Sequence, residues 1–125
     1  MSNMQKKICA IRGAIDTKNT EQAIRNSVKE LITFLYNENN LVEEDIVSIQ
    51  FTVTKDLTEL NPAAALRSLG FADNVPLFCS QEPDVKNGLP NMIRVMITVY
   101  LDAIPKHCYL GLAKTLRPEF AIKMK

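Results

Sequence analysis

Apolar residues recur along the chain with a period of two in several segments, and each of these segments predicts a strand. Apolar and polar residues alternate from residue 46 to residue 53, and again, most clearly, from residue 93 to residue 101. Residues 7–12 form a short apolar run that Gly13 closes, which predicts a buried strand ending in a turn. Residues 75–79 are another brief apolar run, so a short strand is expected there too.

A helical period appears between the first two predicted strands and predicts a helix over residues 20–36. Asn19 is expected to be its N-terminal capping residue, and the polar cluster at residues 37–40 is expected to end it. The apolar stripe of this helix consists of Ile24, Val28, Leu31 and Leu35, widened by Ala23, Ile32 and Phe34.

A second, shorter helix is predicted in the middle of the chain. Asn61 followed by Pro62 is a favourable helix start, and residues 63–69 are good helix formers before Gly70. Residues 107–116 are apolar again, but their pattern does not decide between strand and helix.

The order of these elements predicts an α+β domain with a mixed β-sheet and two helices over one face. Two helices cover little of such a sheet, so the remaining strand faces favour oligomerisation. Residues 1–125 are expected to form a single domain, because a chain of 125 residues can bury one self-sufficient core but not two.

Composition excludes several classes of protein. A formal net charge of +1, with both signs interspersed, gives no basic field for nucleic acid. No apolar run approaches the roughly 20 residues of a membrane-spanning helix, and no signal-peptide core follows the polar N-terminus, so a cytoplasmic location without membrane association is expected. Three cysteines without CxxC spacing and a single histidine predict neither a disulfide framework nor a metal site.

Four of the five arginines lie outside the solvated side of the long helix, at positions where a permanently charged side chain suggests a specific role. Arg25 alone is on the solvated side of the long helix, whereas Arg12 ends a predicted strand and Arg94 lies within an aliphatic one. Arg67 is in the short helix, and Arg117 precedes a proline. Guanidinium groups suit carboxylate or phosphate recognition, although a single one is more often paired with Asp or Glu. Four together favour an anion-binding site.

A further group of candidate residues, Cys79 to Glu82, follows the short predicted strand, where loops carry function. Cys79 as a nucleophile would need a base, and His107, the only histidine, has no supporting motif and is expected to be structural. Glu82 could act as a general base, but a loop carboxylate is more often solvated or ion-paired. No glycine-rich phosphate loop or nucleophile elbow is present.

Five segments, in order over nearly the whole chain, resemble the monofunctional chorismate mutases of the Bacillus type. They are IRGA at 11–14, PAAALR at 62–67, VPLFCSQE at 75–82, IRVMITV at 93–99, and YL at 109–110 followed by LRP at 116–118. One segment alone would be a weak signal, whereas five in register are specific, and they contain the same four arginines. The resemblance implies a homotrimer that forms a pseudo-α/β barrel, with three active sites between neighbouring subunits.

The resemblance also implies the reaction, the Claisen rearrangement of chorismate to prephenate in the biosynthesis of phenylalanine and tyrosine. This isomerisation is unimolecular and uses no covalent intermediate, metal or cofactor. The enzyme has to hold a flexible dianion in its reactive conformer and place positive charge where the breaking ether bond gathers negative charge. The resemblance assigns that positive charge to Arg94.

The remaining roles are also implied by the resemblance. Arg12 and Tyr109 bind a substrate carboxylate, and Glu82 receives the ring hydroxyl with Cys79 beside it. The further substrate-binding residues are Phe78, Ser80, Gln81, Arg67, Leu116 and Arg117. The two arginines of this last group are expected near the mouth of the site, where they steer the dianion inward or help a C-terminal tail to close.

Two residues depart from the family pattern, and two other functions remain open. Asn61 stands where the Bacillus enzyme has phenylalanine and Ala64 where it has lysine, so the pocket is expected to be more polar and less cationic. The alternatives are a trimeric imine deaminase-like enzyme, which would hold a carboxylate and activate a water, and a non-catalytic binder of a small carboxylate metabolite. The binder would be expected to lose Glu82 or Arg94, and both are present.

Overall fold

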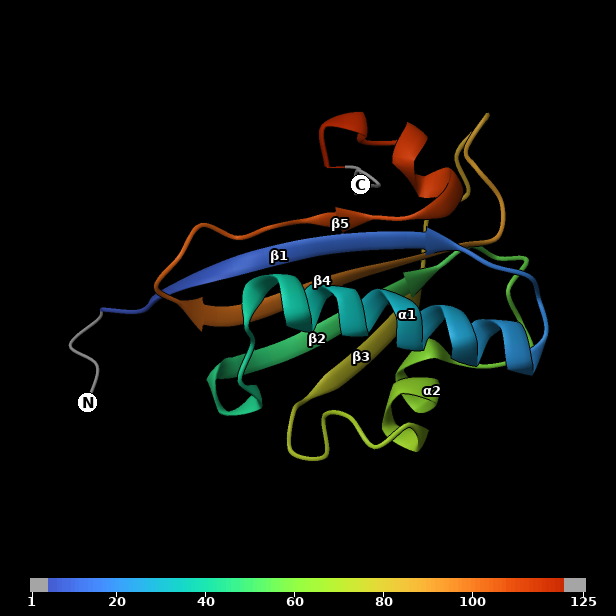
Figure 1. The fold of residues 1–125 in the computed structure, drawn as a ribbon. Coiled ribbons are helices and arrows are strands. Elements are labelled where there is room, and N and C mark those ends of the chain that lie inside the picture. Colours follow the sequence, from blue (N-terminus) through green and yellow to red (C-terminus); the bar gives the residue numbers. More distant parts are fainter. Residues whose placement is uncertain (1–4, 121–125) are drawn as a thin grey trace.

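Two helices pack on one face of a five-stranded sheet (Figure 1). A computed structural model describes residues 5–120, so the lysines that end the C-terminal tail lie outside the described residues. The strands are β1 (Lys7–Asp16), β2 (Ile46–Val53), β3 (Leu77–Gln81), β4 (Met92–Leu101) and β5 (Cys108–Tyr109), and the helices are α1 (Glu21–Asn39) and α2 (Pro62–Ser68). Short 3₁₀ turns lie at Glu43–Asp45, Gly111–Thr115 and Pro118–Phe120.

The sheet is mixed, as the sequence predicts. Its strand order is β3-β2-β4-β1-β5, in which β4 is antiparallel to both β1 and β2. The two outer pairs, β2 with β3 and β1 with β5, are parallel. This order places Arg94 on the central strand, opposite Ala14 of β1 on one side and Thr52 of β2 on the other.

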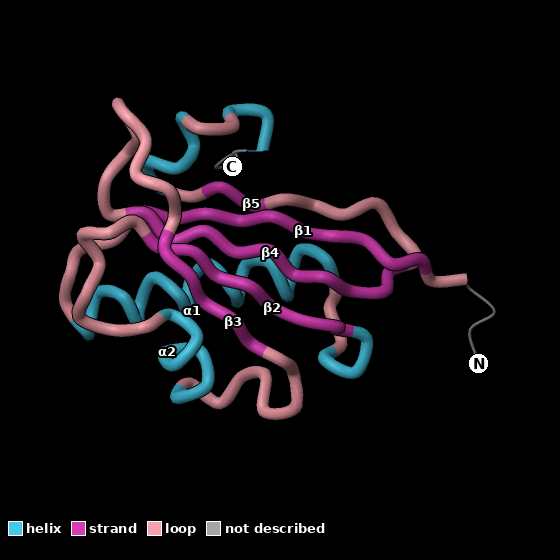
Figure 2. The backbone as a smooth tube through the Cα atoms, turned by 180° about the vertical axis from the view of Figure 1, so that it is seen from behind, coloured by secondary structure: helices cyan, strands magenta, loops and turns pink. Residues whose placement is uncertain are grey.

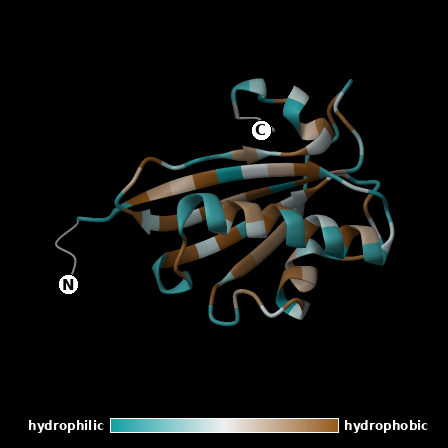
Figure 3. Cartoon of the chain, viewed as in Figure 1, coloured by the Kyte–Doolittle hydropathy of each residue, from teal (hydrophilic) through white to brown (hydrophobic). Residues whose placement is uncertain are grey.

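The core lies between the sheet and α1, and it confirms the apolar stripe predicted for that helix. Hydrophilic and hydrophobic residues alternate along α1 (Figure 3), and the hydrophobic ones face the sheet. The sheet contributes alternate residues of its three central strands. The largest fully buried side chains of this core include Ile11, Ile24, Leu31, Ile32, Leu35, Ile49, Phe51, Leu66, Ile93 and Ile97.

The other face of the sheet is not covered by either helix, and we call it the open face. Figure 2 shows it from behind, with the strands in front and both helices on the far side. Its side chains include Arg12, Thr52 and Arg94, together with the partly exposed Met96 (40%) and Tyr100 (45%). The open face therefore combines charged and apolar side chains on one surface.

The predicted end of the first strand at Gly13 is wrong. β1 continues to Asp16, and Gly13 pairs with Val95 of β4 and Cys108 of β5. A Cβ atom at Gly13 would lie 2.9 Å from Cδ1 of Leu35 in α1. Gly13 thus serves the close packing of α1 on the sheet rather than a turn. Arg12 consequently lies inside the strand.

The predicted cap of the long helix is also wrong by one residue. Thr20 is the N-cap, and its hydroxyl accepts a hydrogen bond from the Ala23 amide at 3.0 Å. The Asn19 side chain instead accepts hydrogen bonds from the amides of Thr58 (2.8 Å) and Glu59 (3.0 Å). Asn19 therefore ties the start of α1 to a distant loop.

Further boundaries differ from the prediction. α1 extends to Asn39 rather than residue 36. β3 spans Leu77–Gln81 rather than residues 75–79, so Ser80 and Gln81 belong to the strand and not to a loop after it. β3 starts later because its ladder with β2 begins at Leu77, opposite Ile49, and ends at Gln81, opposite Val53. The undecided segment at 107–116 contains both a two-residue strand, β5, and a 3₁₀ turn.

The short helix α2 begins where the sequence predicts, and its cap allows a first test. The Asn61 side chain accepts hydrogen bonds from the amides of Ala63 (2.8 Å) and Ala64 (3.4 Å). We expect Asn61→Ala to lower the free energy of unfolding by about 1 kcal/mol, because those amides lose their partner. Urea unfolding measures the change. Asn61→Asp keeps the acceptor and should stay close to wild type, whereas equal losses in both variants would contradict the capping role.

Candidate active site

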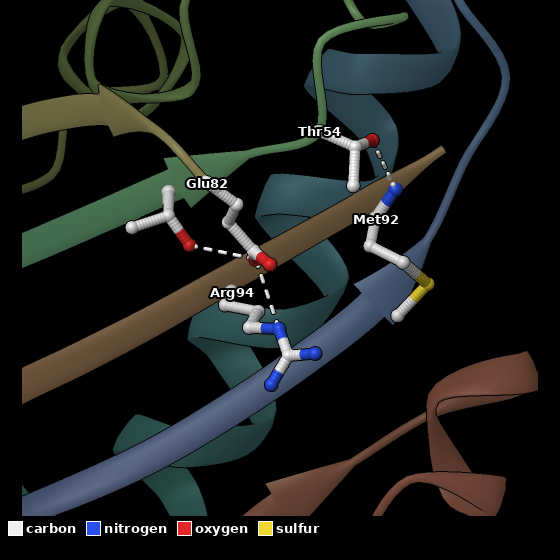
Figure 4. Close-up of polar contacts among 5 residues, drawn as sticks. Thr54, Glu82, Met92 and Arg94 are labelled. Atoms are coloured by element: carbon white, nitrogen blue, oxygen red, sulfur yellow. Dashed lines mark hydrogen bonds and ion pairs between the residues drawn. The ribbon is translucent and has the colours of Figure 1, made fainter. Parts of the chain in front are cut away.

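An ion pair between Arg94 and Glu82 lies on the open face. The Arg94 side chain leaves the central strand β4, and Glu82 directly follows β3. Nε of Arg94 is 2.9 Å from Oε2 of Glu82, and a dashed line marks this contact in Figure 4. The carboxylate side chain is 17% exposed and the arginine side chain 42%. The arginine therefore keeps accessible surface while its partner is largely enclosed.

The contact between the two groups is ionic rather than an aligned hydrogen bond. Nε of Arg94 is buried, and within residues 5–120 it has no hydrogen-bond partner of acceptable geometry despite its short distance to Glu82. The two terminal nitrogens of the guanidinium point away from the carboxylate (Figure 4). These terminal nitrogens are the part of a guanidinium that can donate paired hydrogen bonds to the oxygens of a carboxylate or another anion.

A cavity of about 250 Å³ opens beside this ion pair. It is lined by Arg12, Gly13, Gln50, Thr52, Arg94, Val95, Met96 and Tyr109. Two permanent positive charges reach it from adjacent antiparallel strands, and a tyrosine reaches it from β5. Convergent cations and a phenol around one concave surface are suited to a small anion with more than one oxygen group.

A second cavity, of about 360 Å³, shares Arg94 with the first. Glu82 and Arg94 line it together with the segments 54–56 and 83–85 and the segment 88–90. The exposed ion pair between Lys55 and Asp84, 2.7 Å long, joins two of these segments. Arg94 therefore lines both cavities, and Glu82 lines the second one only.

His107 forms a hydrogen bond with the backbone of β1 at Arg12. The backbone N–H of Arg12 donates a hydrogen bond to Nδ1 of His107 at 2.9 Å. Burial lowers the pKa of His107 below its ordinary value of 6.5, and the nearby charges of Arg12 and Arg117 lower that pKa further. An imidazole that accepts a hydrogen bond at Nδ1 is neutral. The hydrogen bond and the two nearby arginine charges therefore both favour the neutral form of His107. This contact fits the structural role expected for His107.

The lowered pKa of His107 predicts how stability depends on pH. Below about pH 6.5 the unfolded chain binds a proton that the folded imidazole resists, so the free energy of unfolding should fall as the pH drops toward the folded pKa. Above about pH 6.5 the neutral imidazole of His107 makes its full contribution to the free energy of unfolding. His107→Asn offers an oxygen near the position of Nδ1 but does not titrate. We expect the melting temperature of wild type to fall more between about pH 7.5 and about pH 5.5 than that of the variant; equal falls would contradict the assignment.

The structure brings four of the residues singled out in the sequence to one region of the open face. Arg12, Arg94 and Tyr109 line the smaller cavity, and Glu82 contacts Arg94 at its edge. Arg117 and Leu116 lie in the C-terminal segment beside them. Leu116 packs against the small cluster that contains Tyr109, and Arg117 forms an ion pair of 2.7 Å with a neighbouring glutamate.

The other candidate residues do not line this cavity. Cys79 packs against the helix-side core, and burial raises the pKa of its thiol. Arg67 belongs to α2, where its guanidinium donates a hydrogen bond of 3.4 Å to the carbonyl of Val75. Phe78 is 75% exposed on the edge strand β3, which also carries the exposed Ser80 and Gln81. Within one chain these residues do not line the cavity of Arg12 and Arg94.

Sequence reasoning missed two residues of the site, Gln50 and Thr52. Both line the smaller cavity, and the Thr52 hydroxyl donates a hydrogen bond of 2.8 Å to Oε2 of Glu82. Their alternation along β2 indicated that they share a face of that strand. It could not indicate that β2 lies between β3 and β4, which is what brings Thr52 to Glu82 and Arg94.

Two kinds of feature are absent from residues 5–120. No group of three or more His, Cys, Asp or Glu side chains there is close enough to hold a metal ion. In the same part of the chain, no helix is both long and apolar enough to span a lipid bilayer.

Comparison with known proteins gives one consistent family. The family model for chorismate mutase type I matches residues 8–120. The chain is 38% identical to chorismate mutase AroH of Bacillus subtilis over 120 residues, which cover 92% of this chain and 94% of that protein. It is 37% identical over 114 residues to chorismate mutase AroH of Thermus thermophilus, covering 87% and 93% of the two chains.

A solved structure agrees with these sequence matches. The chorismate mutase from Clostridium thermocellum superimposes with a TM-score of 0.81 at 41% sequence identity, covering 86% of this chain and 98% of that one. Fold and sequence are therefore similar to the same group of enzymes over most of the chain. The chain belongs to the type I chorismate mutase family.

Proposed function

We propose that the cavity of Arg12, Arg94 and Tyr109 is the place where this chain, an isomerase of the chorismate mutase family, converts chorismate to prephenate. The observation that carries the proposal is the convergence of two arginines on one small cavity beside a carboxylate. Chorismate carries two carboxylates, a ring hydroxyl and an ether oxygen, and each of these groups has a complementary side chain in or beside the cavity.

Arg94 stabilises the charge that develops in the reaction. As the ether bond of chorismate breaks, negative charge gathers on its oxygen, and a guanidinium held in place binds that oxygen more strongly in the transition state than in the ground state. Glu82 holds Arg94 at Nε, and the terminal nitrogens remain directed away from that carboxylate. No proton has to move between the enzyme and the substrate in this step.

The other residues hold the substrate in its reactive conformer. Arg12 and Tyr109 bind carboxylate oxygens, and Glu82 accepts a hydrogen bond from the ring hydroxyl. Because the rearrangement is unimolecular, restricting a flexible dianion to one compact conformer is a large part of what the site contributes. The backbone bond between Arg12 and His107 supports this role, because it fixes the strand on which Arg12 stands.

We also propose that the complete site forms between subunits of a homotrimer with a pseudo-α/β barrel. Arg67, Phe78 and Cys79 match the family pattern but do not line the cavity of their own chain: Arg67 belongs to α2, and the other two belong to the edge strand β3. A neighbouring subunit docked on the open face would bring its own copies of these residues to the cavity. The exposed apolar residues of that face, Met96 and Tyr100, favour such burial.

The remaining expectations form part of the same proposal. Residues 1–125 constitute a single chorismate mutase domain that works in the cytoplasm, in the biosynthesis of phenylalanine and tyrosine. The reaction uses neither metal nor cofactor, and the partners are the substrate and the other two subunits rather than nucleic acid or membrane. Arg117, Leu116, Ser80 and Gln81 complete the binding site.

Purified protein incubated with chorismate provides the test. We expect a saturable loss of the ultraviolet absorbance of chorismate and formation of prephenate, identified by its acid conversion to phenylpyruvate. Light scattering after gel filtration should give a mass near three times the 14.1 kDa of the chain. A folded protein that leaves chorismate unchanged would refute the activity, and turnover of an imino acid instead would favour the deaminase-like alternative. An active monomer would refute the trimer alone.

A further inference from the structure

We propose that Thr52 is a positioning residue for the reaction, because its hydroxyl fixes one oxygen of Glu82 and so keeps the fork of Arg94 available for the substrate. The inference deepens the proposed function and rests on it. Thr52 lies in the middle of β2, directly opposite Arg94 of β4 and Ser80 of β3.

Two groups converge on the same carboxylate oxygen. The Thr52 hydroxyl donates a hydrogen bond to Oε2 of Glu82 at 2.8 Å, and Nε of Arg94 lies 2.9 Å from that oxygen (Figure 4). The backbone of Glu82 is fixed as well, because its N–H donates to the carbonyl of Val53 at 2.9 Å and extends the β2–β3 ladder by one residue. The carboxylate is thus held through both its backbone and its side chain.

The direction of the Thr52 hydrogen bond is fixed by chemistry. An ionised carboxylate only accepts hydrogen bonds, so the hydroxyl hydrogen of Thr52 has to point at Oε2. Oε2 is then occupied by Thr52 and Arg94. In the proposed site the second oxygen, Oε1, can therefore receive the ring hydroxyl of chorismate.

Without the hydroxyl, Glu82 would be expected to turn toward Arg94. The present contact uses Nε alone, and its N–H is not aligned with the carboxylate. A carboxylate that is free to rotate prefers two parallel hydrogen bonds with a guanidinium, which would engage a terminal nitrogen of Arg94. That nitrogen is one of those that the proposed mechanism places on the substrate. Thr52 therefore prevents a strong ion pair from competing with the reaction.

The central experiment compares three threonine variants. Thr52→Val removes the hydroxyl with little change in shape, and we expect kcat for chorismate to fall by about tenfold to a hundredfold, with KM changed by less than about threefold. Thr52→Ser restores the donor and should recover kcat to within about threefold of wild type. Thr98→Val makes the same chemical change on neighbouring β4, at a residue opposite Ala10 and Ser48, and should leave kcat unchanged.

A double-mutant cycle separates this role from a general effect on the sheet. If Thr52 acts through Glu82, Thr52→Val should cost no further activity once Glu82→Gln is in place, because the carboxylate that the hydroxyl positions is gone. A loss of the same size in both backgrounds would overturn the inference. So would a Thr52→Val enzyme within twofold of wild type, or a Thr52→Ser enzyme no better than the valine variant.

The outcomes also separate this inference from the function on which it rests. Wild-type protein without chorismate turnover would refute the proposed function, and the role of Thr52 with it. Active wild type with an unaffected Thr52→Val variant would refute the role of Thr52 alone. Melting temperatures of all variants show that the assays compare folded proteins, and the serine variant keeps the test decisive if valine is not tolerated.

Discussion

Replacing Arg94 by alanine should reduce kcat for chorismate by about a hundredfold to a thousandfold. The expected size is that of losing one preorganised donor aimed at developing negative charge, about 3 to 4 kcal/mol of transition-state stabilisation. Arg94 is held in advance, since β4 is the central strand of the sheet and Glu82 lies 2.9 Å from Nε. Little reorganisation is then needed when the ether bond breaks.

The variants Arg94→Lys and Arg25→Ala test the reason for that loss. Lysine keeps the positive charge without the planar fork, so its activity should fall between those of wild type and the alanine variant. Arg25 lies in α1, on the opposite side of the sheet, and its removal should leave kcat near wild type. An Arg94→Ala enzyme within tenfold of wild type, assayed well below its melting temperature, would exclude Arg94 as the principal charge.

Replacing Phe51 by alanine should lower the free energy of unfolding by about 3 to 5 kcal/mol. Phe51 is 1% exposed and lies on the helix side of β2, opposite Cys79 of β3 and Val95 of β4. Neighbours on both sides are fixed in the sheet, so they cannot close the cavity left by the ring. Natural domains have only about 5 to 15 kcal/mol of stability, so this single change removes a large share of it.

Urea unfolding followed by circular dichroism measures this loss. Wild type and variants have to be compared at equal protein concentration, because assembly would add a concentration-dependent term to the stability. Phe51→Leu keeps most of the buried volume and should lose clearly less than Phe51→Ala. A loss below about 1 kcal/mol for the alanine variant would show that the core relaxes around the missing ring.

The elements with strong periodicity were predictable from sequence because one face of each is buried in the same core. The stripe of α1 and the alternation in β2 and β4 correspond to the residues that meet between helix and sheet. Gly13 and Asn19 misled the prediction for a different reason. Each has a tertiary role, the first against Leu35 and the second against Thr58, and local sequence does not record such contacts.

The candidate site was predictable only where a residue type conflicts with its surroundings. Arg94 is a charge inside an aliphatic strand, and Arg12 is a charge in a mostly apolar run. Thr52 does not differ from its surroundings in this way, since threonine is a common residue in a half-buried strand. Its importance depends on the order of the strands, which brings residues from three separate segments to one carboxylate.

The sheet order also constrains how the chain can fold as it is synthesised. β1 is the first strand to leave the ribosome, but its antiparallel partner is β4, so Lys7 has to wait for Leu101 and Asp16 for Met92. Until then the main native partner available to β1 is α1. Contacts between such distant parts of the chain make folding slow, because loop closure must precede the gain from pairing. Arg12 and Arg94 come together in that late pairing, so a nascent or truncated chain that stops before β4 lacks the cavity that these two residues line.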